Sequence, residues 1–322
     1  MTKTTKTITT HAPGKLFIAG EYAVVETGYP AILVAVNRYV TIELDESTKQ
    51  GSIHSEQYGK QPVVWHRRDG KLYVEREDRP VDYVVSTIMT VEELVAERKQ
   101  PLRFFDLHIK SELDDTSGRK FGLGSSAAVT VATTRALNTF YQLDLDALKM
   151  LKLSLLATVR VNSKASGGDL AASMFGGWIL YTSPDREWLI EQLKTSSIDE
   201  LISKDWPGFS VNHIPTPQHT RLLVGWTGEP ASTTRLVDRL QQNTELDRNA
   251  YNNFLSSSKK ATMDLAEALR ADDSDAVMAG IRKSRQLLNT LSELAGLQIE
   301  TAELARLCET AELAGAAAKS SG

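Results

Sequence analysis

The spacing of hydrophobic and polar residues along the chain predicts a mixed α+β fold. Residues 31–44 are rich in β-branched and apolar side chains and are bounded by turn residues, which predicts one long strand or two strands broken near Asn37. Further strands are expected within or at 52–76, 104–110, 178–182, 208–214 and 221–226. Helices are expected at 82–98, from 125 onward, at 144–160, before 176–177, and at 231–242, 248–271, 273–295 and 299–315.

These elements divide the chain into two parts. Strands dominate the first part, whereas helix-forming residues prevail after the turn Ser183-Pro184-Asp185. A chain of 322 residues is also about twice the usual size of one domain. We therefore expect an N-terminal domain at 1–184 and a C-terminal domain at 185–322.

Composition and charge exclude several classes of protein. Apolar residues make up 41% and charged residues 24%, as in globular proteins, and the net charge of −4 gives no general attraction to nucleic acid or to an anionic membrane. No apolar run is long enough to cross a bilayer, and the N-terminus has no hydrophobic signal core, so we expect a cytoplasmic location. Cys308 is the only cysteine, which excludes an intramolecular disulfide and favours a packing role.

The segment from Lys120 to Ala128 has the residues of a phosphate-binding loop. Glycines at 122 and 124 let an anion approach the backbone, the helix that follows directs its N–H groups at it, and Ser125 and Ser126 add hydroxyls. One serine hydroxyl can also bind Mg²⁺. Taken alone, the segment could equally be a flexible turn with a serine cap. A dinucleotide-binding fingerprint fits poorly because the preceding residues are polar, and a Walker A motif is absent.

Two further clusters combine charge with glycine. Lys15 lies in the apolar segment 12–24, which ends in the glycine–acid–aromatic turn Gly20-Glu21-Tyr22. The residues 164–169 place a hydroxyl, two glycines and the carboxylate of Asp169 in a turn before a helix. Each cluster also has an ordinary interpretation, because a strand can carry a solvated lysine and an aspartate commonly caps a helix.

Together, the three segments resemble the signature regions of the GHMP kinases, and the resemblance spans nearly the whole chain. It implies an N-terminal α/β domain of the ribosomal-protein type, a C-terminal ferredoxin-like domain, and an active site between them. Within the family, the chain looks most like the members that act on phosphomevalonate. The residues that carry this finer resemblance are Gly20 to Val24, Lys120-Phe121, Leu223 to Gly228 and Pro230 to Thr233.

The resemblance implies a reaction and a set of site residues. ATP would phosphorylate 5-phosphomevalonate to 5-diphosphomevalonate in the mevalonate pathway of isoprenoid biosynthesis, with Mg²⁺ bridging the nucleotide phosphates. Lys15 and Asp169 would flank the transferred group, and Ser126 is a possible Mg²⁺ contact. The implied ATP-phosphate contacts are Lys120, Gly122, Leu123, Gly124, Ser125, Ser126 and Ala127. The implied substrate contacts are Lys15, Tyr22, Ser166 and Gly167.

The chemistry requires a local cluster of cations, because two polyanions must meet on a protein of negative net charge. The candidates within or beside the motifs are Lys15, Arg119, Lys120 and Lys164, with Arg38 and Arg160 as weaker ones. The acceptor is a phosphate oxygen that is mostly deprotonated at neutral pH, since the second pKa of a phosphate monoester is about 6. We therefore expect Asp169 to orient Lys15 more than to accept a proton.

The C-terminal residues 318–322 resemble the beginning of a third glycine-rich motif of the family. We expect the chain to stop inside this motif, which would leave the phosphate site more open and the C-terminal domain incomplete. Two alternatives remain at this point. The protein could be another GHMP enzyme, such as a mevalonate kinase or a diphosphomevalonate decarboxylase, or it could be a nucleotide-binding module without turnover.

Overall fold

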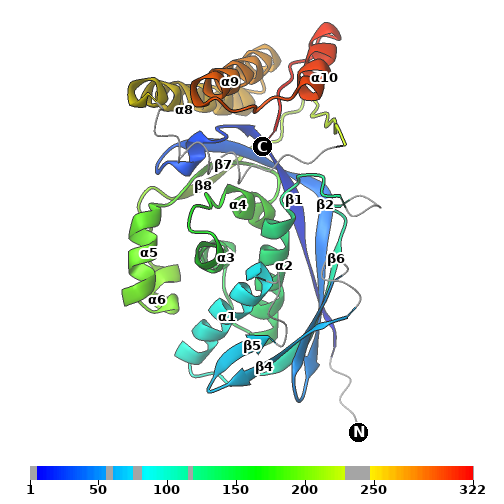
Figure 1. The fold of residues 1–322 in the computed structure, drawn as a ribbon, viewed down its shortest axis with the longest axis vertical. Helices are drawn as coiled ribbons and strands as arrows, with labels where there is room; N and C mark the ends of the chain where they lie inside the picture. The colour runs from blue at the N-terminus through cyan, green and yellow to red at the C-terminus, as the bar shows by residue number, and fades with distance from the viewer. Residues whose placement is uncertain (1–5, 56–60, 75–81, 115–118, 229–246, 322) are drawn as a thin grey trace.

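One mixed eight-stranded sheet forms the centre of the molecule (Figure 1). The computed structural model describes residues 6–55, 61–74, 82–114, 119–228 and 247–321. The strand order is β5-β4-β3-β6-β2-β7-β8, and β1 pairs with β2 beside this path. The strands are β1 (Ile8–Ala19), β2 (Pro30–Ser47), β3 (Gly51–Ser55), β4 (Val63–Arg68), β5 (Lys71–Val74), β6 (Phe104–Ser111), β7 (Trp178–Thr182) and β8 (Ser210–Ile214).

Helices cover both faces of this sheet. The described helices are α1 (Asp82–Glu97), α2 (Ser125–Tyr141), α3 (Ala147–Val161), α4 (Gly168–Phe175), α5 (Arg186–Thr195), α6 (Ile198–Ser203), α8 (Arg248–Ala271), α9 (Ser274–Ala295) and α10 (Ala302–Leu313), with a short 3₁₀ turn, η1, at Ala23–Val25. Figure 1 shows α1 to α4 stacked on one face, with α5 and α6 beside them and α8 to α10 forming a separate layer at one end. Within the described residues, no helix is long and apolar enough to cross a membrane.

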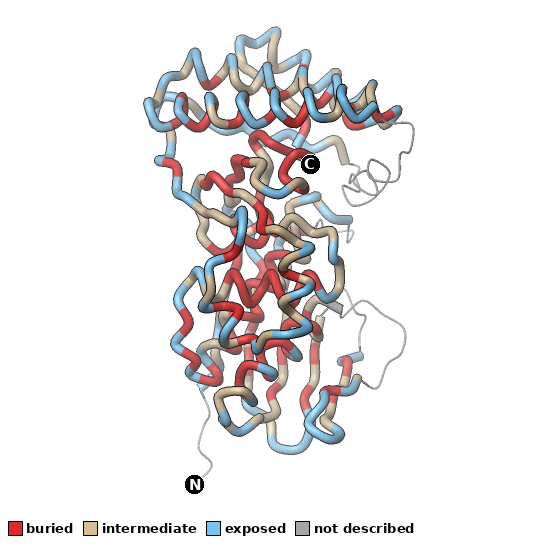
Figure 2. Tube along the Cα trace, turned by 90° about the vertical axis from the view of Figure 1, so that its left-hand side faces the viewer, coloured by how far each residue is buried: buried red, intermediate tan, exposed pale blue. Residues whose placement is uncertain are grey.

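Strand β2 explains why both faces are covered. Along its first half, alternate residues point to opposite sides of the sheet, as the pleat of a strand requires. Leu33 packs into the main core with α2, α3 and α4, whereas Ile32 and Val34 pack into a second cluster with Leu265 and Leu269 of α8. Figure 2 shows buried and exposed residues alternating along the helices of the end layer, so one side of each helix packs inward and the other is exposed.

Strand β1 is the edge that faces the candidate site. It pairs antiparallel with β2, and the register shifts between Pro13 and Lys15 and again between Phe17 and Ala19. Such irregularities bend a strand and redirect its side chains. The register shift between Pro13 and Lys15 lies directly before Lys15, and it therefore affects the direction of the Lys15 side chain.

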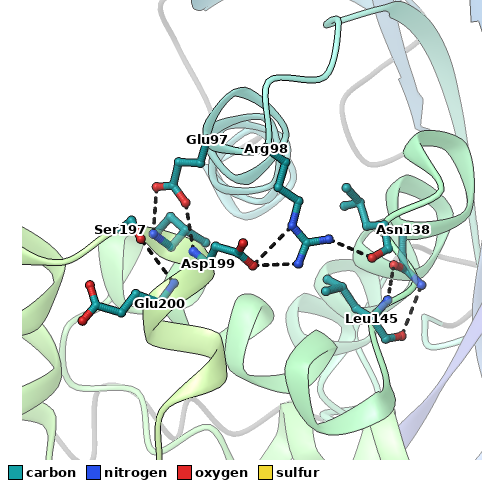
Figure 3. Close-up of polar contacts among 9 residues, drawn as sticks. Glu97, Arg98, Asn138, Leu145, Ser197, Asp199 and Glu200 are labelled. Atoms are coloured by element: carbon teal, nitrogen blue, oxygen red, sulfur yellow. Dashed lines mark hydrogen bonds and ion pairs between the residues drawn. The ribbon is translucent and has the colours of Figure 1, made fainter.

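A polar junction joins α1 to α6 (Figure 3). The Glu97 carboxylate accepts hydrogen bonds from the backbone N–H groups of Ile198 and Asp199, at 2.8 and 2.9 Å. Arg98 pairs with the Asp199 carboxylate at 2.6 Å and donates to the carbonyl of Leu143. An acid at a helix N-terminus and a guanidinium that bridges three elements stabilise this arrangement, so α6 is fixed to the N-terminal helices.

Most of the expected elements are present, and the α+β class is confirmed. Residues 30–47 form a single long strand, and α8 has the bounds predicted from the sequence. The strand expected at 221–226 is wrong, because these residues have no regular secondary structure. The helix expected at 231–242 lies outside the described residues.

Residues that follow the expected domain boundary at 184 continue the first sheet. Strand β8 pairs antiparallel with β7, and Leu189, Leu201 and Trp206 belong to the main core. The division into 1–184 and 185–322 stays a prediction. Cys308 is buried, as expected for a packing residue, and burial raises the pKa of its thiol.

Candidate active site

The glycine loop is attached to β1 at Lys15. The backbone N–H of Lys15 donates to the carbonyl of Leu123 at 2.8 Å, and the side chain of Lys15 crosses Gly124 so closely that a Cβ there would lie 2.9 Å from the lysine Cε. Gly122 and Gly124 have φ values of 81° and 80°, which are accessible to glycine at little cost. Gly14 allows the same close approach, since a Cβ at this position would lie 2.9 Å from the Leu123 carbonyl oxygen.

Lys15 is a buried cation within electrostatic range of two carboxylates. Its side chain lies beside the loop, and the residue is only 9% exposed. Burial lowers the pKa of Lys15, while the nearby charges of Asp169 and Glu21 raise it and so offset part of this effect. A buried ammonium group next to a glycine loop can stabilise charge that develops on a phosphoryl group.

The turn before α4 positions Asp169. Gly167 has φ = 78° and has no room for a side chain, because a Cβ would lie 2.1 Å from Cδ2 of Leu155. The fully buried Tyr181 hydroxyl donates to the carbonyl of Ser166 at 2.6 Å, which fixes the turn from the sheet side. The pKa of Tyr181 is raised by burial and by the Asp169 charge. Asp169 lies in the first turn of α4 and accepts a hydrogen bond from the N–H of Leu170.

The helices α2 and α4 begin differently from the others. Among helices with a described N-cap, α3, α5, α6, α8, α9 and α10 begin with an aspartate, serine or threonine whose side chain accepts from a backbone N–H of the first turn. By contrast, α2 and α4 begin at Gly124 and Gly167, and neither has a side-chain cap. The first N–H groups of α2 are thus left for another acceptor, as a phosphate site requires. In α4, by contrast, the N–H groups of Gly168 and Leu170 donate to the side chains of Ser166 and Asp169.

The glycine–acid–aromatic turn follows β1, and the charge of its Glu21 acts on Lys15. Tyr22 has φ = 62°, is 3% exposed, and its hydroxyl has no hydrogen-bond partner among the described residues. An aromatic residue with this backbone conformation is strained, and such strain concentrates at functional sites. Burial and the neighbouring Glu21 raise the pKa of Tyr22, so its hydroxyl stays protonated and can act as a donor.

Glu21 forms a buried ion pair with Lys319, 298 positions away in the chain. The two side chains are 4% and 6% exposed. Close by, the Ser321 hydroxyl accepts from the N–H of Phe17 at 3.0 Å and donates to the carbonyl of the same residue at 2.9 Å. The C-terminal residues are therefore held at two points, with Ser321 bonded to Phe17 of β1 and Lys319 paired with Glu21 just beyond the strand.

A small cavity lies between this turn and the helical layer. It is lined by Gly20 and Glu21 and by residues of α8 and α9. Three buried hydroxyl side chains face it, namely Ser258, Thr262 and Ser284. Periodicity alone could not have placed these hydroxyl groups beside the turn at Gly20 and Glu21.

The structure brings together only some of the residues expected from the sequence. Lys15 lies against the loop at Gly124 and is influenced by the charges of Asp169 and Glu21. Asp169 and the turn at Ser166 and Gly167 belong to the start of α4, whereas Tyr22 packs with Phe254, Leu255 and Leu288 of the helical layer. Lys120 is exposed and pairs through its backbone with Asp114. Arg160, a weaker candidate, forms an ion pair with Glu93 and a hydrogen bond to Thr90 of α1.

The residues present are compatible with Mg²⁺ held mainly by nucleotide phosphates. No group of three or more His, Cys, Asp or Glu side chains within the described ranges could enclose a metal ion. Mg²⁺ commonly uses only one or two protein ligands together with phosphates and water. Ser126, in the first turn of α2, offers a hydroxyl of the kind that fits this role.

Sequence reasoning assigned no role to the two residues of the buried ion pair beside the site. Glu21 was recognised as part of a turn but received no role, and Lys319 was read only as part of a terminal motif. An acidic residue inside an apolar turn was the available signal for Glu21, since a buried carboxylate needs a partner. The identity of that partner could not be derived from local spacing.

Comparison with known proteins identifies relatives of the whole chain. The family description "GHMP kinases N terminal domain" matches residues 82–177. A phosphomevalonate kinase from Streptomyces sp. (strain CL190) is 42% identical over 332 residues, covering 100% of this chain and 88% of that protein. A mevalonate kinase from Pyrococcus abyssi is 27% identical, covering 95% of this chain and 82% of its own length.

Two solved structures share the fold closely. The Lin0012 protein from Listeria innocua has a TM-score of 0.92 and 35% identity, covering 98% of this chain and 88% of that one. Phosphomevalonate kinase from Streptococcus pneumoniae, in complex with phosphomevalonate and AMPPNP, has a TM-score of 0.84 and 31% identity with the same coverage. The chain therefore belongs to the GHMP kinase family, within which it is similar to the phosphomevalonate kinases.

Proposed function

We propose that this protein transfers the γ-phosphoryl group of ATP to 5-phosphomevalonate and so forms 5-diphosphomevalonate in the mevalonate pathway. The observation that carries the proposal is the buried Lys15, bonded through its backbone to the glycine loop and influenced by the charges of Asp169 and Glu21. The similar pneumococcal enzyme holds phosphomevalonate and AMPPNP, which are a substrate and an ATP analogue for this reaction.

The transfer needs positioning and charge stabilisation more than proton transfer. An oxygen of the substrate phosphate attacks the γ-phosphorus, a new O–P bond forms, and the bond to the β,γ-bridging oxygen breaks as ADP leaves. That oxygen is already deprotonated in most molecules at neutral pH, because the second pKa of a phosphate monoester is about 6. Asp169 would then orient Lys15, and Lys15 would stabilise the charge on the transferred group.

The remaining residues divide between the two substrates. The N–H groups of the loop from Gly122 to Ala127 would hold the nucleotide phosphates at the start of α2. The protonated Tyr22 hydroxyl and the turn at Ser166 and Gly167 would contact phosphomevalonate. Mg²⁺, held in part by Ser126, would neutralise phosphate charge when bound. A cytoplasmic location is part of the proposal, since both substrates are small charged metabolites.

The test is the choice of acceptor. ADP release should depend on phosphomevalonate and be weak or absent with mevalonate, diphosphomevalonate and galactose, and ³¹P NMR should show a diphosphate product. A clear preference for mevalonate would make a mevalonate kinase the better assignment, and decarboxylation of diphosphomevalonate would favour the decarboxylase. ATP binding without transfer to any of the four would support a nucleotide-binding module.

Two variants test the assigned roles. Lys15→Ala should lower kcat by roughly 10²–10³, the scale of losing one preorganised contact in the transition state. Asp169→Asn should cause a smaller loss if this carboxylate orients Lys15. An abolished reaction in Asp169→Asn, with a pH profile governed by one carboxylate, would assign Asp169 as a base instead. Lys194→Ala, at an exposed pair on α5, is the control.

A further inference from the structure

An aromatic contact joins the phosphate loop to a segment far along the chain. Phe121 directly precedes Gly122, the first glycine of the loop, and its ring meets the ring of Trp226 edge to face. The ring centroids are 4.8 Å apart and the planes are inclined by 72°. This is a favourable geometry for two aromatic rings.

Two arginines extend this contact on either side. The guanidinium of Arg38, on β2, lies 5.5 Å from the centroid of the Phe121 ring, and that of Arg119 lies 5.7 Å from the Trp226 ring. Arg119 also donates to the carbonyl of Gly228 at 3.4 Å. A row of cation, ring, ring and cation therefore lies beside the loop, with each ring against a positive charge.

The segment that carries Trp226 has few other anchors among the described residues. Residues 220–227 have no regular secondary structure, and Leu223 and Val224 are 85% and 58% exposed. Gly225 lies against α10, where an added Cβ would come within 2.7 Å of the Leu307 side chain. The segment is thus held at adjacent positions by the C-terminal helical layer and by the phosphate loop.

Phe121 is also fixed on its other side. Its backbone N–H donates to the carbonyl of Leu113 at 3.2 Å, and the Leu113 side chain is 2.8 Å from the position that a Cβ on Gly14 would take. Phe121 therefore lies between the β1 side of the loop and Trp226. Losing the Trp226 ring would release one of these two constraints directly before the first loop glycine.

We propose that Trp226 is a positioning residue of the nucleotide site, which holds Phe121 and thereby the start of the phosphate loop in its binding conformation. This inference rests on the proposed kinase function and adds a residue that does not itself touch the reacting atoms. Trp226 links ATP binding to the C-terminal part of the chain. Its indole is 39% exposed, so its fluorescence reports on the polarity at the edge of the loop.

Steady-state kinetics test the positioning role. Trp226→Ala should raise the KM for ATP by roughly fivefold, the equilibrium equivalent of losing one aromatic contact. The KM for phosphomevalonate should change much less. Trp226→Phe keeps a ring against Phe121 and should restore most of the ATP affinity. Trp188→Phe, a partly buried tryptophan on α5, is the matched control and should leave both KM values unchanged.

Fluorescence separates this inference from the kinase assignment. MgATP should change the emission of the wild-type protein with a saturable dependence, the change should persist in Trp188→Phe, and it should be lost in Trp226→Phe. If the wild type shows no phosphomevalonate-dependent ADP release but gives this pattern, the kinase assignment fails and the positioning role stands. Equal ATP affinity in Trp226→Ala and Trp188→Phe, or an equal rise in both KM values of Trp226→Ala, would overturn the inference.

Discussion

Replacing Lys319 by methionine tests how firmly the C-terminal residues are bound to the site. Lys319 and Glu21 are 6% and 4% exposed and form an ion pair, so the substitution leaves a carboxylate in a nearly dry environment. Removing one member of a buried pair typically costs about 3–5 kcal/mol. Because Lys15 also lies near Glu21 and can compensate in part, we expect about 3 kcal/mol for Lys319→Met.

Urea unfolding followed by circular dichroism gives the free energy of unfolding directly. A double-mutant cycle with Glu21→Gln should then return a coupling of about 1–3 kcal/mol, because the neutral partner no longer needs a counter-charge. Lys194→Met is the control, since its pair with Glu191 on α5 is exposed and contributes little. The reasoning fails if Lys319→Met destabilises the protein no more than Lys194→Met does.

Three further predictions concern the residues around Lys15. Gly124→Ala should lower kcat by roughly 10², the scale of a 1 Å displacement, because the new methyl group meets the Lys15 side chain. Gly70→Ala is the control. Gly70 has a similar φ of +76° but open space around it, so its substitution should affect stability alone. Tyr22→Phe should leave stability nearly unchanged, since the lost hydroxyl has no partner within the described chain. It should raise the KM for phosphomevalonate, because this hydroxyl is the proposed substrate contact. A large loss of stability would contradict this prediction. Glu21→Gln removes a charge that raises the pKa of Lys15. Because the protonated form of Lys15 is the active one, the alkaline fall of kcat should begin at lower pH than in the wild type. An alkaline fall of kcat at the wild-type pH would show that Glu21 does not act on Lys15.

The phosphate loop and most helices were predictable because their signals are local. Glycines at 122 and 124 before an alanine-rich helix describe the loop without any tertiary information, and the helix-forming composition of residues 248–271 predicted α8. The residues 221–226 have the composition of a strand but no strand structure, since a strand also needs a hydrogen-bonded neighbour. Composition cannot supply that neighbour.

The site itself was only partly predictable from the sequence. Lys15 and Asp169 could be named from motifs, but the burial of Lys15 and the influence of Asp169 and Glu21 on its charge depend on how β1, α4 and the turn at Tyr22 pack. The Glu21–Lys319 pair joins residues near the two ends of the described chain. Contacts of this separation leave no periodic trace, so they appear only when the fold is known.

Strand β1 gives the site a common mechanical support. Pro13 accepts a hydrogen bond from Ser173 of α4, Lys15 binds the loop, and Phe17 binds Ser321, so three separate segments are attached within five consecutive residues of one strand. Local opening of the β4–β5 hairpin would leave these attachments intact, whereas opening of β1 would release all three together. In a native-state hydrogen-exchange experiment, the amides of β1 should therefore belong to the slowest group. The denaturant concentration that exposes them should be the one at which catalytic competence disappears in a single step.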